Sequence, residues 1–232
     1  MKPRRIAVVP ARGGSKRLPD KNIKNFHGKP MMGHILDAAR ESELFDCIHV
    51  STEDGHIMEV ADQLGYKVDF MRPNELADDH TPLMPVLKHV VDTFKERGRI
   101  FDQVVLLMAC APLIEASDLR EGSLLFERFS GKRAVMSITS YPVPVEWAYS
   151  RREDGLLEPV QPGMFAVRSQ DLPKRYYETG CFTFFPVQQV LGGGSGDDGN
   201  FVGLILPRWK SVDIDDAEDW ELAERLFQKK RQ

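Results

Sequence analysis

The chain of 232 residues is 42% hydrophobic and 28% charged, which suits one globular domain with at most a small protruding subdomain. Its formal net charge of −4 disfavours a general nucleic-acid-binding protein. No run of about 18 apolar residues exists, so no membrane-spanning helix is expected. The apolar stretch behind the basic N-terminus ends at Pro10 and is too short for a signal-peptide core. The three cysteines stand far apart without a CxxC pair, and we expect a cytoplasmic protein.

Strand and helix signals alternate along the first part of the chain. An apolar, β-branched run at residues 5–10 predicts a buried strand, and a loop rich in Gly and Lys follows at 11–30. Further strands are predicted at 47–51, 66–70, 104–108 and 134–139. Helices are predicted at 31–43, 54–64, 81–96 and 117–129. Ser117 is the expected N-cap of the last of these helices.

The pattern changes between residues 140 and 180. Five prolines interrupt it, at positions 142, 144, 159, 162 and 173, and aromatic residues lie between them. We interpret this segment as an excursion of short strands and loops; an oligomer contact, a substrate lid and an ordinary insertion all stay open. The main fold resumes with strands at 181–186 and 202–206. A closing helix at 216–229 follows, with Asp216 as its expected cap.

Strands that alternate with helices predict an α/β fold, with a parallel or mixed sheet covered on both faces. We expect a single domain over residues 1–232, from which 140–180 protrudes. In such sheets, ligands bind beyond the carboxyl ends of the strands. The loop at 11–30 lies at this edge, as do the segments after Val50 and Met108.

The loop after the first strand reads Pro10-Ala-Arg-Gly-Gly-Ser-Lys-Arg-Leu-Pro-Asp-Lys-Asn22 and matches neither the Walker pattern nor GxGxxG. Gly13 and Gly14 let the backbone bend tightly and approach a ligand. Exposed N–H groups in such a loop can cradle anionic oxygens. Arg12, Lys16 and Lys21 add positive charge. We interpret the run as a triphosphate-binding loop, with a solvated basic turn as the alternative.

A second motif, Ser211-Val-Asp-Ile-Asp215, lies near the C-terminus. In a strand, residues two apart face the same way, so Asp213 and Asp215 would present two carboxylates side by side while Ile214 enters the core. Paired carboxylates repel unless a positive charge lies between them, and Mg²⁺ bound to phosphate oxygens fits. In the alternative interpretation, Asp215 or Asp216 caps the following helix.

Two further stretches carry weaker signals. Arg72 directly follows a predicted strand and therefore points toward the ligand edge of the sheet. Asp78, Asp79 and His80 resemble metal ligands in type, but we favour loop and helix-cap chemistry for them. Arg168 can clamp a carboxylate with two parallel hydrogen bonds.

These residues resemble the acylneuraminate cytidylyltransferases, also called CMP-sialic acid synthetases. The run at residues 6–22 looks like the family signature, and the resemblance covers nearly the whole chain. The motifs that continue it in the family's order lie at 50–54, 72–77 and 212–215. Stretches that look most like the pseudaminic acid cytidylyltransferases lie at 75–82, 139–144 and 168–172. The sialic acid enzymes typically have Gln at the position of Met108, and often Arg-Pro-Asn-Gly where this chain has Tyr177-Glu-Thr-Gly180.

The resemblance implies a Rossmann-like sheet and a homodimer in which each subunit lends a protruding segment, here 140–180, to its partner's site. It also implies CTP and a nine-carbon 2-keto sugar acid, pseudaminic acid first among them, as substrates. The C2 hydroxyl of the acid would attack the α-phosphorus of CTP and release pyrophosphate. The expected cofactor is Mg²⁺ or Mn²⁺.

The resemblance also assigns roles to residues. Those expected to bind the nucleotide are Ala11, Arg12, Gly14, Ser15, Lys16, Lys21, Asn22 and Arg72. Lys21 or Arg12 would stabilise the charge on the leaving pyrophosphate, so both are candidate catalytic residues together with the metal-binding Asp213 and Asp215. Those expected to meet the sugar are Arg168, Gln170, Phe182 and Phe184. A metal-bound water or a carboxylate would take the hydroxyl proton, and that choice stays open.

Other interpretations remain. The acceptor could be N-acetylneuraminic acid, legionaminic acid or a shorter octulosonate. The chain could also be a non-catalytic, nucleotide-binding regulatory homologue, although the basic loop together with both aspartates argues against it. A nucleotidyltransferase for sugar 1-phosphates is disfavoured, because the first loop lacks GxGxRL-type spacing.

Overall fold

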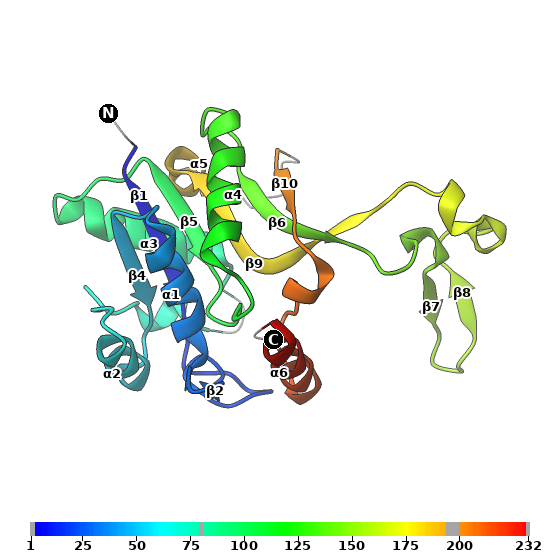
Figure 1. Cartoon of the computed structure of the whole chain (residues 1–232), viewed down its shortest axis with the longest axis horizontal. Helices are drawn as coiled ribbons and strands as arrows, with labels where there is room; N and C mark the ends of the chain where they lie inside the picture. The colour runs from blue at the N-terminus through cyan, green and yellow to red at the C-terminus, as the bar shows by residue number, and fades with distance from the viewer. Residues whose placement is uncertain (1–2, 79–80, 194–199, 231–232) are drawn as a thin grey trace.

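The computed structural model describes residues 3–78, 81–193 and 200–230. Within this part of the chain, a six-stranded sheet has the order β10-β6-β9-β5-β1-β4 (Figure 1). Its strands are β1 (Arg5–Pro10), β4 (Cys47–Ser51), β5 (Gln103–Leu107), β6 (Val135–Ser140), β9 (Tyr176–Pro186) and β10 (Val202–Ile205). β9 runs antiparallel to β5 and β6, whereas the other pairs are parallel. The prediction of a mixed, mainly parallel sheet is confirmed.

Helices cover both faces of the sheet because successive residues of its strands enter opposite cores. In β5, Val105 and Leu107 pack on one face beneath α1, α2 and α4. Val104 and Leu106 pack on the other face beneath α3 and α5. The helices are α1 (Met31–Ser42), α2 (Gly55–Gln63), α3 (Leu83–Glu96), α4 (Ala116–Arg128), α5 (Val187–Leu191) and α6 (Ala217–Lys230).

The helix ends show why the chain turns where it does. Asp54 caps α2, because its carboxylate accepts hydrogen bonds from the backbone N–H groups of His56 (2.7 Å) and Ile57 (3.2 Å). Asp216 accepts similar bonds at the start of α6, as predicted. The N-cap of α4 lies two residues earlier than expected: Glu115 is the N-cap, and the predicted cap Ser117 lies inside the helix.

The strand predicted at 66–70 is wrong. Gly65, with φ +85°, ends the turn after α2, and the Tyr66 N–H then bonds back to the carbonyl of Ala61 at 2.9 Å. The Tyr66 hydroxyl donates to the carbonyl of Leu36 on α1 at 2.9 Å. The apolar residues of this run are therefore buried against helices, and the segment crosses the edge of the sheet as a loop.

A long projection leaves the body of the molecule between β6 and β9 (Figure 1). The two strands continue as a ribbon in which Ser140 pairs with Tyr176. At its far end lies a hairpin of β7 (Tyr149–Arg151) and β8 (Leu157–Pro159). The short elements of the chain are β2 (Asn25–Phe26), β3 (Lys29–Pro30), η1 (Asn74–Leu76), η2 (Val145–Trp147), η3 (Met164–Ala166), η4 (Ser169–Asp171) and η5 (Arg208–Lys210).

Candidate functional site

A cavity of about 330 Å³ opens at the carboxyl ends of β1 and β5, where Pro10 ends one strand and Met108 follows the other. This is the edge at which α/β sheets bind ligands. The predicted site residues that line it are Arg12, Ser15, Lys21, Asn22, Arg72, Asp213 and Asp215. Two segments separated by about 190 residues in sequence therefore meet in one cavity.

Lys21 joins the two segments directly. Its ammonium group donates hydrogen bonds to the carbonyl of Ile214 and to the carboxylate of Asp215, the latter at 3.1 Å. The guanidinium of Arg17 donates to the other oxygen of Asp215 at 2.6 Å. The basic loop and the acidic segment thus hold each other in place, and both face the cavity.

The two aspartates sit side by side although the segment around them is not a strand. Ile214 is fully buried between them, beside Met31 and Trp220. The predicted strand conformation is wrong here, because residues 211–215 have no ladder partner among the described residues. The predicted alternation nevertheless holds, since Asp213 and Asp215 both line the cavity.

The pKa values of the two carboxylates are shifted in opposite directions. Desolvation by the surrounding protein, and then the charge of Asp215, raises the pKa of Asp213. Desolvation also acts on Asp215, but the hydrogen bonds and charges of Lys21 and Arg17 outweigh it and lower its pKa. Among the described residues, none donates a hydrogen bond to the carboxylate of Asp213. Asp213 therefore has oxygen atoms available for a cation.

Arg72 is held by a residue that the sequence analysis missed. Its guanidinium is buried and donates to Glu53, and its Nε has no hydrogen-bond partner within the described part of the chain. Glu53 also accepts the N–H of Gly13 at 2.9 Å. Glu53 therefore couples the basic loop to Arg72. Its signals in sequence are its place just after a strand that ends at the same edge and its membership of the motif at 50–54.

The other residues expected to bind the nucleotide differ in how they are placed: one is buried and bonded through its backbone, and two are exposed to solvent. Ala11 is fully buried, and its N–H donates to the carbonyl of Ser51 at 2.9 Å. Gly14 and Lys16 are exposed and do not line the cavity. Asp78 does line it and accepts the N–H of Thr81 at 2.6 Å, which is the turn chemistry we expected. Its predicted neighbours Asp79 and His80 lie outside the described residues.

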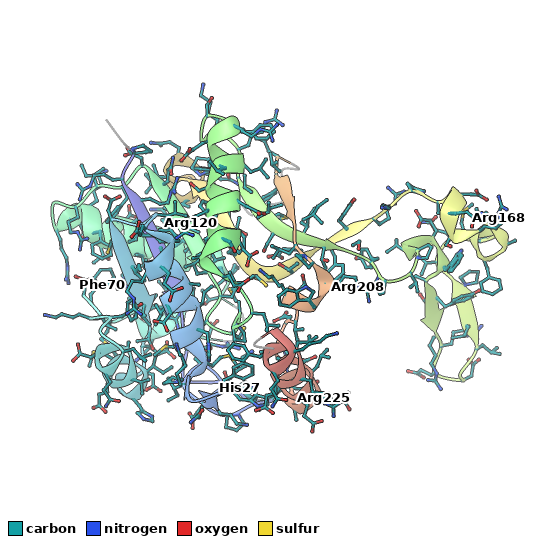
Figure 2. All side chains as sticks on the ribbon, viewed as in Figure 1. His27, Phe70, Arg120, Arg168, Arg208 and Arg225 are labelled. Carbon is teal, nitrogen blue, oxygen red and sulfur yellow. The ribbon has the colours of Figure 1, made fainter. Side chains whose placement is uncertain are left out.

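The predicted sugar contacts fall in two other places. Arg168 lies far out on the projection (Figure 2), where it pairs with Asp171 at 2.8 Å, and Gln170 is exposed beside it. Phe182 and Phe184 do share a strand face, but that face is the core beneath α4, and they are 2% and 0% exposed. Their rings are therefore structural, because no ligand can reach them without displacing α4.

The described residues include neither a preformed metal cluster nor a membrane-spanning helix. No three His, Cys, Asp or Glu side chains are grouped so that they could hold a metal ion by themselves. A cation at Asp213 and Asp215 would thus need further ligands from a substrate or water. The described helices also include none that is long and apolar enough to cross a membrane.

Comparisons with known proteins agree on one family. Residues 6–122 match the family described as cytidylyltransferase. The chain is 31% identical over 224 residues to a pseudaminic acid cytidylyltransferase of Campylobacter jejuni, covering 96% of this chain and 95% of the relative. It is also 31% identical over 230 residues to a CMP-N,N'-diacetyllegionaminic acid synthase of Legionella pneumophila, covering 96% of each.

A solved structure has the same fold. It is a CMP:2-keto-3-deoxy-manno-octonic acid synthetase complexed with CTP, which superposes with a TM-score of 0.70. The match covers 98% of this chain and 99% of that one, at 16% sequence identity. At that identity the likeness establishes the fold alone.

Proposed function

The chain belongs to the cytidylyltransferase family, and we propose that it joins CMP from CTP to pseudaminic acid, with release of pyrophosphate. It is a nucleotidyltransferase that uses CTP to activate a nonulosonic acid. The choice of pseudaminic acid is supported by the similarity to the Campylobacter jejuni enzyme over nearly its whole length. The observation that carries the proposal is the Lys21 bridge, which brings a basic loop and two aspartates to one cavity.

The cavity offers each part of CTP a suitable partner. Arg12, Ser15 and Lys21 line it and would bind the triphosphate, with Gly14 and Lys16 at the outer side of the same loop. Asn22 and Arg72 would contact the nucleoside. The unpaired Nε of Arg72 supports this role, because a buried donor is stabilised when a ligand supplies its acceptor. Ala11 would take part through its backbone only.

Asp213 and Asp215 would hold Mg²⁺ or Mn²⁺. The donor set fits a hard cation, because both groups offer carboxylate oxygens and Asp213 accepts no hydrogen bond from any described residue. The ion would supply positive charge that neutralises the phosphate oxygens. Phosphate oxygens and water would complete its coordination, since two protein ligands are too few.

The transfer itself needs little covalent help from the protein. The C2 hydroxyl oxygen of the acid forms a bond to the α-phosphorus while the bond to pyrophosphate breaks, and the hydroxyl proton passes to a water or a carboxylate. Arg12 and Lys21 stabilise the negative charge that gathers on the leaving pyrophosphate. Hydrogen bonds to Ile214 and Asp215 already orient the ammonium group of Lys21, so its positive charge is in position before the reaction begins.

The proposal extends to assembly and location. Residues 1–232 form one nucleotidyltransferase domain, and 140–180 is the segment through which two subunits form a dimer. Exposed apolar side chains on the projection support this role, among them Val143 (59%), Val160 (58%) and Phe165 (72%). Arg168 and Gln170 would then meet the sugar acid in the partner's site. A cytoplasmic location is supported by three free cysteines.

Pyrophosphate release from CTP and Mg²⁺ tests the proposal, with pseudaminic, legionaminic, N-acetylneuraminic and octulosonic acids as separate acceptors. We expect turnover with pseudaminic acid at the highest kcat/KM. Legionaminic acid is the second candidate, because the Legionella pneumophila relative is equally similar in sequence. Tight CTP binding without pyrophosphate release for any acid would instead identify a regulatory homologue.

A further inference from the structure

Two positive side chains of the basic loop bind the same carboxylate, but they are held in different ways. Lys21 is 15% exposed, and its ammonium group also donates to the carbonyl of Ile214. Arg17 is 66% exposed, and Asp215, to which it donates at 2.6 Å, is its sole hydrogen-bond partner among the described residues. The fold therefore fixes Lys21, whereas Arg17 can leave Asp215 by rotation of its own side chain.

The acidic segment keeps its position without Arg17. The backbone N–H of Asp215 donates to the carboxylate of Asp219 at 2.9 Å. Ile214 is fully buried, and its carbonyl accepts from Lys21. An exposed ion pair adds little to stability, because solvent screens it and two side chains lose freedom in forming it. Arg17 can therefore release Asp215 at little cost to the fold.

Arg17 and a divalent ion would compete for Asp215. Arg17 and Lys21 each bind one oxygen of this carboxylate, so a metal ion on it would lie beside two positive charges. Like charges at such short range repel each other strongly. The charge of Arg17 also acts on Asp213, the other proposed metal ligand. Binding of a metal ion by itself is thus disfavoured while Arg17 holds Asp215.

A triphosphate reverses this balance. It brings several negative charges into the cavity that Asp215 lines, and these attract both the metal ion and the positive side chains of the loop. A guanidinium can bind phosphate oxygens through two parallel N–H···O bonds. Arg17 does not line the cavity, but its guanidinium already reaches Asp215 at the cavity wall. A phosphate oxygen near Asp215 is therefore within reach of the same side chain.

We propose that Arg17 couples metal binding to nucleotide binding; this rests on the proposed function. Arg17 competes with the divalent ion for Asp215 until the triphosphate draws the guanidinium away. The ion therefore binds tightly only together with CTP. Arg17 is a positioning residue in this scheme, because it acts on the ion through Asp215.

Binding of Mn²⁺ to the full-length protein tests this, measured by the electron paramagnetic resonance signal of the free ion. Arg17→Met removes the charge and keeps most of the length of the side chain. Without nucleotide, it should tighten Mn²⁺ binding about fivefold, which corresponds to about 1 kcal/mol. With CTP and no acceptor acid, it should weaken Mn²⁺ binding severalfold, because the phosphates lose a guanidinium partner.

The opposite signs of these two effects separate the proposal from a structural role. A variant that merely disturbed the loop would weaken Mn²⁺ binding in both conditions. Arg17→Lys keeps the positive charge and should restore the weak binding of the wild type without nucleotide. Arg225→Met is the matched control, because Arg225 is an exposed arginine of α6 that pairs with Glu221 and does not line the cavity. Its Mn²⁺ affinities should equal those of the wild type.

Equal Mn²⁺ affinities of the wild type and Arg17→Met without nucleotide would overturn the inference, as would weaker binding by the variant in both conditions. Binding that survives Asp213→Asn would place the ion elsewhere and would also overturn it. Failure of the proposed function gives a different result: a wild type that binds Mn²⁺ and CTP but releases no pyrophosphate with any acid. The Mn²⁺ affinities need no turnover, so in that case they still decide the role of Arg17.

Discussion

At the scale of single residues, the site depends on a few charges that are fixed before substrate arrives. Lys21 is only 15% exposed and is bound to two groups of the acidic segment. Lys21→Ala should lower kcat by roughly 100-fold, because one preorganised charge on a developing anion contributes a few kcal/mol. The measurement is kcat for pyrophosphate release at saturating substrates.

Lys24→Ala is the control for this change. Lys24 belongs to the same loop, but its ammonium lies over the ring of Trp220, 4.6 Å from the centroid, and does not line the cavity. Its kcat should stay near that of the wild type. Equal losses in both variants would show that the loop needs its total charge rather than Lys21 in particular.

Substitutions of the two aspartates should lower activity far more than they lower the free energy of unfolding. Asp213→Asn and Asp215→Asn should each remove most activity, because both carboxylates are proposed to hold the divalent ion. Asp213 accepts no hydrogen bond from the described residues, so its replacement should change the free energy of unfolding by less than about 0.5 kcal/mol. Asp215→Asn breaks ion pairs with Lys21 and Arg17 and should cost up to about 1 kcal/mol.

Urea unfolding and activity across a Mg²⁺ titration measure the two effects. Near-normal turnover of both variants at saturating Mg²⁺ would end the metal proposal. A large stability loss in Asp213→Asn would show that this carboxylate is structural.

At the scale of elements, the segment that carries the aspartates is anchored to α4. Lys210 of η5 is 7% exposed and donates to Asp118 (2.7 and 2.8 Å) and to Glu115 (2.7 Å) at the start of that helix. Lys210→Met would leave Asp118 buried without its cationic partner, with only the backbone N–H of Glu115, among the described residues, donating to it. We expect it to lower the free energy of unfolding by about 3 kcal/mol, and to lower kcat because residues 211–215 follow directly.

This anchor should also be sensitive to alkali. Desolvation would lower the pKa of Lys210, but the hydrogen bonds and charges of Asp118 and Glu115 outweigh it and raise the pKa above 10.5. A raised pKa means that the folded protein holds this proton more tightly than the unfolded chain does. The stabilisation is therefore complete below pH 10.5 and is lost as pH rises through the folded-state pKa. The deficit of Lys210→Met, measured by urea unfolding, should be constant up to about pH 10 and shrink above it; a deficit independent of pH would contradict this.

At the scale of the whole molecule, the projection lies away from the body (Figures 1 and 2), so Arg168 is remote from the cavity of its own chain. If two subunits exchange projections, a mixture of Lys21→Ala and Arg168→Ala chains should regain activity that neither variant has alone. A mixed dimer would have one site with both Lys21 and a donated Arg168. Co-expression should therefore restore up to roughly a quarter of wild-type activity.

Two observations check the mixing experiment. Light scattering of the wild type should give twice the mass of the 26.4 kDa chain. Arg168→Lys should regain little activity, because a lysine cannot form the two parallel bonds of a guanidinium. A monomeric wild type would contradict the proposed exchange.

Much of this architecture could be predicted from sequence because its signals are local. The buried run at 5–10, the glycines behind it and the Asp-Ile-Asp motif each act within a few residues. The alternation of strands and helices then places the basic loop at the carboxyl edge. The strand predicted at 66–70 failed because Tyr66 and Val68 are apolar for a different reason: they are buried against helices, and periodicity over five residues cannot distinguish the two cases.

The sequence by itself determined the family, the sheet and the chemistry of the loop around Lys21. Only the tertiary structure decided how the side chains of β9 are divided between the two faces of the sheet. Phe182 and Phe184 pack in the core beneath α1, α2 and α4, whereas Phe185 packs in the core beneath α3 and α5, so the local alternation does not say which helices each face meets. The bulge at Gly180 then reverses the alternation and puts Glu178 on the same face of the sheet as Thr183. Such a reversal depends on pairing with a distant strand, which is the physical reason that local sequence does not contain it.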